Sequence, residues 1–191
     1  MRFVLKTLIK GILHGVFLTL AFPMAALSLF GRMQPLYRFF AQSCALVPGL
    51  LGGYLRMACY KLTLEECALQ SRSQFGSFFA HPRAKVGRLM YIGSYCVPGR
   101  TAIGDRTQIA SLVQVLSGPR QHARHEHGRM LGSEYGAFDL VTIGASAIVL
   151  ADLGAGSTLG ARSVVTNPVS PGSVAVGNPA RVIKTSGESA G

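Results

Sequence analysis

The chain has 191 residues, of which 49% are hydrophobic and only 14% are charged, and its mean hydropathy is +0.34. This composition excludes an intrinsically disordered chain and is more apolar than that of an ordinary soluble enzyme. Nineteen basic and eight acidic residues give a formal net charge of +11.

The positive charge is unevenly placed. Residues 1–64 contain seven basic residues and no acidic one, whereas the remainder contains twelve basic and eight acidic residues. Basic residues that flank apolar runs suit an anionic membrane surface, while nucleic-acid binding calls for a dense basic patch with stacking aromatic residues. We therefore expect a membrane partner and no nucleic acid.

Two uncharged runs, Gly11 to Gly31 and Phe39 to Leu55, dominate this N-terminal part. The first is long enough to span a bilayer but contains Pro23, and the second is broken by Pro48 and several glycines. Four interpretations remain open: a bilayer-crossing helix pair, a helical hairpin or re-entrant element kinked at Pro23, a cleaved signal peptide, and a helix buried in the core or in an oligomer interface. The even spread of positive charge favours the hairpin.

Residues 1–64 are accordingly predicted to form a membrane-associated helical segment. Its last part, Leu50 to Tyr60, predicts an amphipathic helix. This helix either lies in the membrane interface, with Arg56 and Lys61 reaching the headgroups, or packs on the following domain. The four cysteines form no CxxC pair and indicate reduced, buried thiols on the cytoplasmic side, with a disulfide framework as the alternative.

From Val86 onward, glycine follows an aliphatic residue at a recurring spacing. The pairs are Val86-Gly87, Ile92-Gly93, Ile103-Gly104, Ile143-Gly144, Leu153-Gly154 and Leu159-Gly160. Aliphatic residues also recur six apart at Val97, Ile103, Ile109 and Val115, and at Leu153, Leu159 and Val165. A period of six fits neither a helix nor a hairpin. It predicts a three-sided parallel coil, in which one aliphatic residue per side points inward and a small residue turns each corner, and several such coils must stack to bury their interior.

The repeat carries a family resemblance. The tail from Ser173 to Lys184, SVAVGNPARVIK, resembles the terminal motif of the hexapeptide-repeat acyltransferases, and Gly160 to Val165 resembles their last full repeat. The resemblance covers residues 73–184 and implies a mainly β fold, a left-handed parallel β-helix, for the domain at residues 65–191. Residues 46–51 (LVPGLL) and 60–64 (YKLTL) are similar to a branch of bacterial exopolysaccharide and lipopolysaccharide O-acetyltransferases.

The repeat is interrupted by an excursion at residues 117–140 that holds His122, His125 and His127. Acyl transfer to a hydroxyl needs a base that titrates near neutrality and a donor, commonly a backbone N–H, for the developing oxyanion. The resemblance places the catalytic histidine in a Ser-Gly-x-x-x-His segment, which His122 matches in SGPRQH; a loop histidine that caps a carbonyl is the alternative. Glu134 and Asp139 are the expected orienting carboxylates, or else solvated loop acids.

Three further histidines are candidates for contact with the substrate. His125 and His127 belong to the excursion, and His81 precedes the repeat; the alternatives are solvated loop residues and a structural histidine before a turn proline. His125, Glu126 and His127 lack a third ligand nearby, so no metal is expected.

The resemblance also implies acetyl-CoA as co-substrate and a homotrimer whose donor site lies between adjacent protomers. The pantetheine arm would follow the coils past Gly144, Ala145, Gly160 and Ala161, because a narrow groove needs small side chains. Arg181 and Lys184 are expected near the CoA phosphates or, alternatively, on a solubilising C-terminal face.

Two features depart from the family pattern. Pro98 occupies an aliphatic position and should restrict strand pairing to an edge or a bulge. No Trp-Ile-Gly hexapeptide follows Ile143-Gly144. The loss of one side would rotate the later coils by a third of a turn, unless residues 139–142 supply the missing side.

These features together predict an O-acetyltransferase at the cytoplasmic face of the bacterial inner membrane. It would acetylate a sugar hydroxyl of an exopolysaccharide or lipopolysaccharide glycan, with a lipid-linked glycan as the acceptor. The alternatives are a degenerate, non-enzymatic β-helix that serves as an assembly subunit at the membrane, and an acyltransferase with another acyl donor or an amine acceptor.

Overall fold

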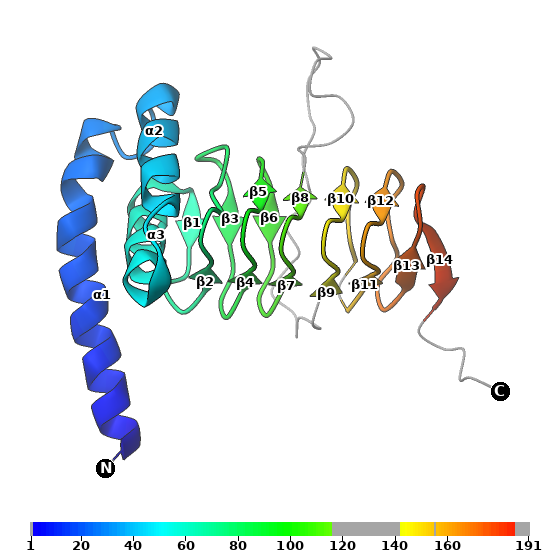
Figure 1. The fold of residues 1–191 in the computed structure, drawn as a ribbon, viewed down its shortest axis with the longest axis horizontal. Helices are drawn as coiled ribbons and strands as arrows, with labels where there is room; N and C mark the ends of the chain where they lie inside the picture. Colours follow the sequence, from blue (N-terminus) through cyan, green and yellow to red (C-terminus); the bar gives the residue numbers. More distant parts are fainter. Residues whose placement is uncertain (1, 116–141, 155, 186–191) are drawn as a thin grey trace.

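The computed structural model describes residues 2–115, 142–154 and 156–185, with the backbone alone for residues 2–7. Three helices, α1 (Arg2–Leu27), α2 (Gln34–Ala45) and α3 (Gly49–Thr63), precede a parallel β-solenoid of about five turns. The helices lie across the N-terminal end of the solenoid, with α1 outermost (Figure 1).

The short strands of the solenoid form three sides, here named A, B and C. Side A contains β1 (Glu66–Cys67), β3 (Lys85–Val86) and β6 (Ala102–Ile103). Side B contains β2 (Arg72–Ser73), β4 (Tyr91–Ile92), β7 (Gln108–Ile109), β9 (Thr142–Ile143), β11 (Thr158–Leu159) and β13 (Val174–Val176), with β14 (Arg181–Lys184) added antiparallel to β13. Side C contains β5 (Val97–Pro98), β8 (Gln114–Val115), β10 (Ile148–Val149) and β12 (Val164–Val165).

In every strand from β1 to β12, the second residue is the buried one. The interior is therefore a stack of single side chains, such as Ile103, Ile109 and Val115 in one coil. This confirms the prediction of a three-sided parallel coil with one inward residue per side. The expectation that Val97 points inward is wrong by one position, because Pro98 is buried and Val97 faces outward.

The spacing between successive inward residues is six at two of the three corners. Inward residues are six apart from side A to side B and from side B to side C. The step from side C to side A varies: it is seven residues from Phe79 to Val86, five from Pro98 to Ile103, and four from Val149 to Leu153. The C-to-A corner is therefore where the described coils differ in length. Residues 116–141 follow Val115 at the end of side C and precede Thr142 on side B.

Strand register continues on both sides of residues 116–141. Thr142 of β9 lies opposite Gln108 of β7 and Thr158 of β11, and Ile148 of β10 lies between Gln114 and Val164. The later coils are thus in phase with the earlier ones, and the one-third rotation does not occur. Pro98 is accommodated inside the stack without a bulge: β5 pairs in register with β8, and on its other side the Pro98 carbonyl accepts a hydrogen bond from the Ala80 N–H of the first coil, so the expected edge or bulge does not occur.

Corner glycines are required by close approach between coils. A Cβ on Gly144 would lie 2.5 Å from the amide nitrogen of Ala161, and one on Gly93 would lie 2.5 Å from that of Ser111. The left-handed backbone conformation falls two residues later, on non-glycine residues such as Ser146 and Leu112. The prediction that small residues turn the corners is confirmed, and the reason is the spacing of adjacent coils.

We expect Gly144→Ala to destabilise the solenoid by about 1–3 kcal/mol, because the added methyl group overlaps the backbone of the next coil. Gly53→Ala in α3 is the control, because no described atom would lie within 4 Å of its Cβ and the added methyl group therefore overlaps nothing. Urea unfolding of both variants measures the difference. Equal losses of stability would contradict the close-approach argument.

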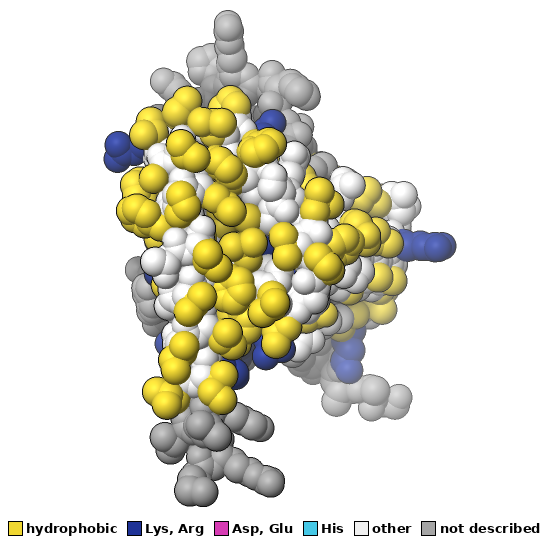
Figure 2. All heavy atoms as spheres, turned by 60° about the vertical axis from the view of Figure 1, so that its left-hand side comes forward, with side chains coloured by type: hydrophobic (Ala, Val, Ile, Leu, Met, Phe, Trp, Pro, Cys, Tyr) yellow, Lys and Arg dark blue, Asp and Glu magenta, His cyan; other side chains and the backbone are white. Residues whose placement is uncertain are grey.

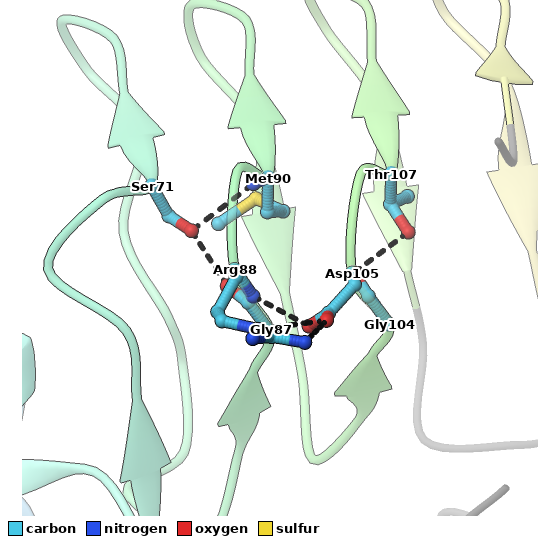
Figure 3. Close-up of polar contacts among 7 residues, drawn as sticks. All are labelled: Ser71, Gly87, Arg88, Met90, Gly104, Asp105 and Thr107. Carbon is cyan, nitrogen blue, oxygen red and sulfur yellow. Dashed lines mark hydrogen bonds and ion pairs between the residues drawn. The ribbon is translucent and has the colours of Figure 1, made fainter. Parts of the chain in front are cut away.

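Adjacent coils are also joined at the A-to-B corner by a charged pair (Figure 3). Asp105 accepts a hydrogen bond of 2.7 Å from the backbone N–H of Arg88 and two further bonds, of 3.0 and 2.8 Å, from the guanidinium of Arg88. In the neighbouring coil the Ser71 hydroxyl donates to the Gly87 carbonyl and accepts from the Met90 N–H. Side chains at this corner therefore bond coil to coil.

The Arg88 contacts give Asp105 a pH-dependent contribution to stability. The backbone and side-chain hydrogen bonds from Arg88 lower the pKa of Asp105 below 3.8. Because the folded pKa is depressed, the contribution is fully present above about pH 4 and is lost as the pH falls through the folded value. Because the Arg88 side chain of this pair is 68% exposed, we expect less than about 1 kcal/mol. The difference in thermal stability between the wild type and Asp105→Asn should be constant from pH 7 to about pH 5 and should shrink as the pH falls below about 4; a difference that does not change with pH would contradict this assignment.

The helices close the open end of the solenoid. The Tyr37 hydroxyl of α2 donates to the carbonyl of Phe79 at 2.9 Å, and the Tyr60 hydroxyl of α3 donates to that of Ser77 at 3.2 Å. Both acceptors belong to the first coil, and the Tyr60 and Phe79 rings meet edge to face. A solenoid needs such a cap because its terminal coil has no neighbour to cover its core.

Arg56 lies beneath this cap with 1% of its surface exposed. Its guanidinium donates to the carbonyls of Cys44, Ala45 and Val47 at the C-terminal end of α2, and to that of Ser73 in the first coil. The expectation that Arg56 reaches lipid headgroups is therefore wrong, because the residue satisfies carbonyls inside the fold. The alternative, that this helix packs on the following domain, is confirmed.

Helix α1 continues through Pro23 and packs on α3. Ala21 and Ala25 are fully buried, Phe17 stacks on Tyr54, and the His14 Nε2 lies 3.2 Å from the carbonyl of Leu69. One helix among the described residues, at Leu8–Leu27, is long and apolar enough to cross a membrane by length and composition. Its packing on α3 favours a helix that stays with the solenoid over a cleaved leader.

Candidate active site

The four small residues expected along the cofactor arm lie together on the corner between sides B and C. Gly144 and Ala145 stack on Gly160 and Ala161: the Gly144 N–H donates to the carbonyl of Leu159, and the carbonyl of Ala145 accepts from the next coil. Only small side chains therefore stand on the surface at this corner. Such a surface lets an extended chain approach backbone N–H and C=O groups.

Small residues also occupy the corner between sides B and C in two earlier coils. Gly93 with Ser94, and Ala110 with Ser111, occupy the equivalent positions after inward residues of side B. We call these eight residues the small-residue column: Gly93, Ser94, Ala110, Ser111, Gly144, Ala145, Gly160 and Ala161. The sequence analysis missed the first four, although extending the six-residue register back to Ile92 and Ile109 would have found them.

The two C-terminal cations lie at opposite ends of β14. Arg181 pairs with Val176, and Val176 lies against Gly160 of the preceding coil. The neighbouring residue Ala180 donates its N–H to the carbonyl of Val164. Arg181 therefore lies at the end of the small-residue column. Lys184 pairs with Val174, three residues along the strand and about 10 Å away. Both are exposed. The structure thus brings Arg181, and not Lys184, to the corner that carries the small residues.

His81 is half-buried at the C-to-A corner of the first coil. Its Nδ1 accepts a 3.1 Å hydrogen bond from the backbone N–H of Arg83, so the neutral ring carries its proton on Nε2. Burial, followed by the charges of Arg100, Arg83 and Arg38, lowers the pKa of His81 below 6.5. His81 is therefore a neutral hydrogen-bond donor at pH 7.

The cations around His81 come from distant parts of the chain. Arg38 of α2 donates to the carbonyl of Ala80, and Arg100 belongs to the same corner in the second coil. Residues 116–141 follow Val115 at this corner in the third coil. Only the folded coil brings this basic edge together, and no sequence signal marks Arg38 as part of it.

His122, Glu134, Asp139, His125 and His127 lie outside the described residues. The structure defines where the segment that contains them departs and returns, after Val115 of β8 and before Thr142 of β9. In the described ranges, no group of three His, Cys, Asp or Glu side chains could hold a metal ion.

All four cysteines are free and buried, as the sequence predicts. Burial raises the pKa of Cys67 to about 12, and burial likewise raises the pKa of Cys96. Thiols with raised pKa values are poor nucleophiles at neutral pH. Cys67 and Cys96 therefore do not suit the role of a nucleophile.

A three-sided parallel solenoid with a hexapeptide register and small-residue corners defines the class as a hexapeptide-repeat β-solenoid. Comparison with known proteins agrees. A maltose O-acetyltransferase from Clostridium difficile superposes with a TM-score of 0.60 at 25% identity, covering 84% of this chain and 90% of that one. A hexapeptide-repeat-containing acetyltransferase from Vibrio cholerae shares the fold, with a TM-score of 0.61 at 15% identity over 82% and 92% of the two chains.

In sequence, the chain is 32% identical over 148 residues to serine acetyltransferase 4 of Arabidopsis thaliana. This match covers 70% of the chain and 39% of the plant protein, so the chain spans about two-fifths of that relative's length. No family model matches. In its repeat, its fold and these matches, the chain is similar to hexapeptide-repeat acetyltransferases.

Proposed function

We propose that the protein is an acetyl-CoA-dependent O-acetyltransferase that acts on a sugar hydroxyl of a bacterial exopolysaccharide or lipopolysaccharide glycan. The observation that carries the proposal is the small-residue column, a run of small side chains that stack along successive coils and end at Arg181. Pantetheine is an extended amide chain and suits a surface of backbone N–H and C=O groups, while Arg181 suits a phosphate. The sugar acceptor is supported by the similarity to a maltose O-acetyltransferase.

His122 is the proposed general base. Its imidazole takes the proton of the sugar hydroxyl as the oxygen attacks the thioester carbonyl, and backbone N–H groups stabilise the oxyanion. The C–S bond then breaks, and the imidazolium returns its proton to the sulfur, so that CoA leaves as the thiol. Glu134 or Asp139 would orient the ring as positioning residues.

The proposed functional unit is a homotrimer. The small-residue column lies at the B-to-C corner, whereas residues 116–141 depart from the C-to-A corner, at the other end of side C. A single chain therefore keeps the donor surface and the point of departure of His122 on different edges. A neighbouring copy can supply the missing half of the site, which supports a shared site between protomers.

The acceptor that we propose is a lipid-linked glycan. Arg38, Arg83 and Arg100 surround His81 on the edge from which residues 116–141 depart. Guanidinium groups suit a phosphate linkage or an acidic sugar, and the neutral Nε2–H of His81 suits a hydroxyl oxygen. His125 and His127 are the further proposed acceptor contacts.

Release of free CoA thiol from acetyl-CoA, measured with maltose, serine, an amino sugar and a phosphate-linked oligosaccharide, tests the function. We expect release that depends on the glycan and an O-acetylated product by mass spectrometry. Longer acyl-CoA donors and the amine acceptor test the rival acyltransferase. No release with any donor would instead favour a non-enzymatic assembly subunit, although the continuous strand register removes the main structural reason for that alternative.

His81→Ala should raise the KM for the glycan acceptor about tenfold, the loss of roughly one hydrogen bond. The KM for acetyl-CoA should not change, because His81 is at the edge away from the small-residue column. Steady-state kinetics with each substrate varied in turn measure both values. An equal rise in the two KM values would contradict a contact with the acceptor.

A further inference from the structure

Large apolar side chains are exposed over the three helices and their connections. We call this set the apolar face: Leu8, Ile9, Ile12, Val16, Leu20, Leu27, Leu29, Phe30, Met33, Leu36, Phe39, Leu46, Leu50 and Leu51, all at least 36% exposed. Figure 2 shows hydrophobic side chains gathered over the helical end of the molecule. An exposed apolar area of this extent marks an interaction surface.

Helix α1 has two stripes with different partners. Phe17, Ala21 and Ala25 face α3. Leu8, Ile12, Val16 and Leu20, spaced four apart, are exposed on the other side, each by 49–60%. The helix is therefore already packed along one side and lacks a partner along the other.

This packing decides the orientation that α1 can take. The helix lies flat across the end of the solenoid, with α3 between it and the first coil (Figure 1). If α1 crossed a bilayer, α3 and the first coil would have to lie beside it within the hydrocarbon, where the exposed charges of Lys61, Glu65 and Glu66 would be costly. A helix that lies in the membrane plane avoids this cost.

The charges around the apolar face identify the surface that covers it. Lys10, Arg32, Arg38 and Lys61 are exposed on the same three helices and their connections, and residues 1–64 contain no acidic residue. In Figure 2, Lys and Arg side chains lie at the margins of the hydrophobic area, and no Asp or Glu side chain is visible among the described residues. An apolar centre with a purely basic margin complements a membrane that carries anionic lipids.

We propose that the apolar face inserts into one leaflet of an anionic membrane, with α1 in the plane of the interface and the solenoid axis along the membrane normal. The protein is thereby a monotopic membrane protein whose coils project into the cytoplasm, because a basic margin without acidic residues suits the anionic cytoplasmic leaflet. The cytoplasmic face of the bacterial inner membrane is the corresponding location. This inference does not require acetyl transfer, so the two proposals fail independently.

The first test is flotation of the full chain with vesicles of phosphatidylglycerol and phosphatidylcholine. Ile12→Gln/Val16→Gln should weaken binding at least about tenfold. Val182→Gln/Ile183→Gln is the matched control, with two aliphatic side chains exposed by 46% and 63% at the far end of the solenoid, and should bind as the wild type does. Vesicles of phosphatidylcholine alone should bind less protein, and binding should fall with salt.

The second test measures depth and exploits the absence of tryptophan from the chain. Leu8→Trp, Val16→Trp and Leu27→Trp each add a sole fluorophore on α1, and Tyr91→Trp adds one on the solenoid as a control. Lipids brominated at different depths should quench the tryptophan fluorescence of the three α1 variants at the same shallow depth. The fluorescence of Tyr91→Trp should not be quenched.

Three outcomes would overturn the proposal. An upright α1 spans about 30 Å from Leu8 to Leu27, so it would place Val16→Trp far deeper than the two ends. Equal vesicle binding by Ile12→Gln/Val16→Gln and the control would show that the apolar face does not meet lipid. Unchanged vesicle binding together with dissociation of an oligomer, measured by light scattering, would assign the face to contacts between copies of the chain.

Discussion

His122→Ala should lower kcat/KM for acetyl transfer by about 10²- to 10⁴-fold, the contribution of a general base to proton removal from a hydroxyl. The remaining rate would come from positioning of the two substrates and from backbone stabilisation of the oxyanion. Thiol release with saturating acetyl-CoA and varied glycan measures the change. The wild-type rate should also fall as the pH drops below the pKa of an imidazole, because the protonated ring cannot accept a proton.

Gln121→Ala is the matched control for this experiment, since it removes the neighbouring side chain of the same segment. We expect it to retain wild-type kinetics, and both variants should keep the wild-type melting temperature. A wild-type rate for His122→Ala would remove the proposed base and direct attention to His125 and His127.

Arg56→Met should lower the free energy of unfolding by about 3–5 kcal/mol. The guanidinium is buried and donates to four carbonyls, three at the C-terminal end of α2 and one in the first coil. Methionine keeps much of the side-chain volume but leaves those buried acceptors without their donor, each at a cost of about 1–3 kcal/mol that partial hydration reduces. The positive charge of Arg56 also interacts favourably with the negative, C-terminal end of the α2 dipole, and methionine loses this interaction. Burial lowers the pKa of Arg56, yet arginine stays charged at neutral pH.

Chemical denaturation of Arg56→Met and Lys61→Ala separates a specific effect from a general loss of positive charge. Lys61 is exposed on the same helix, so its replacement should change stability by less than about 0.5 kcal/mol. Arg56→Lys keeps the charge but cannot bond to four carbonyls, and should fall between the two. If Arg56→Met unfolded at the same midpoint denaturant concentration as the wild type, the four carbonyls would have found other donors.

The sequence predicts the solenoid well because its rule is local. Each hexapeptide carries its own inward aliphatic residue and its own small corner residue, and this pattern is visible without knowing which coils are neighbours. The predicted positions of Ile92, Ile103, Ile109 and Val115 are all buried as expected. At Val97 the six-residue spacing is one position out, because Pro98, which the glycine pattern places in an aliphatic position, fills the inward place.

The candidate site is predicted in part. The period places Gly144, Ala145, Gly160 and Ala161 on one corner, and the structure brings them together. The basic edge around His81 could not be predicted, because Arg38 reaches it from a helix that is more than forty residues away in sequence. The extended strand β14 places Arg181 and Lys184 at opposite ends, a separation that the sequence pattern does not show, and the contact of either cation with the CoA phosphates stays a prediction.

The sequence by itself therefore determined the repeat, the presence of an apolar N-terminal segment and the segment that bears His122, since each is written in the spacing of nearby residues. The tertiary structure alone decided that the coils stay in phase across residues 116–141, that within the described coils the length varies at the C-to-A corner, and that Arg56 lies inside the fold. It also laid α1 flat across the end of the solenoid. These features depend on hydrogen bonds and packing between residues far apart in the chain, and no local pattern encodes which distant surfaces meet.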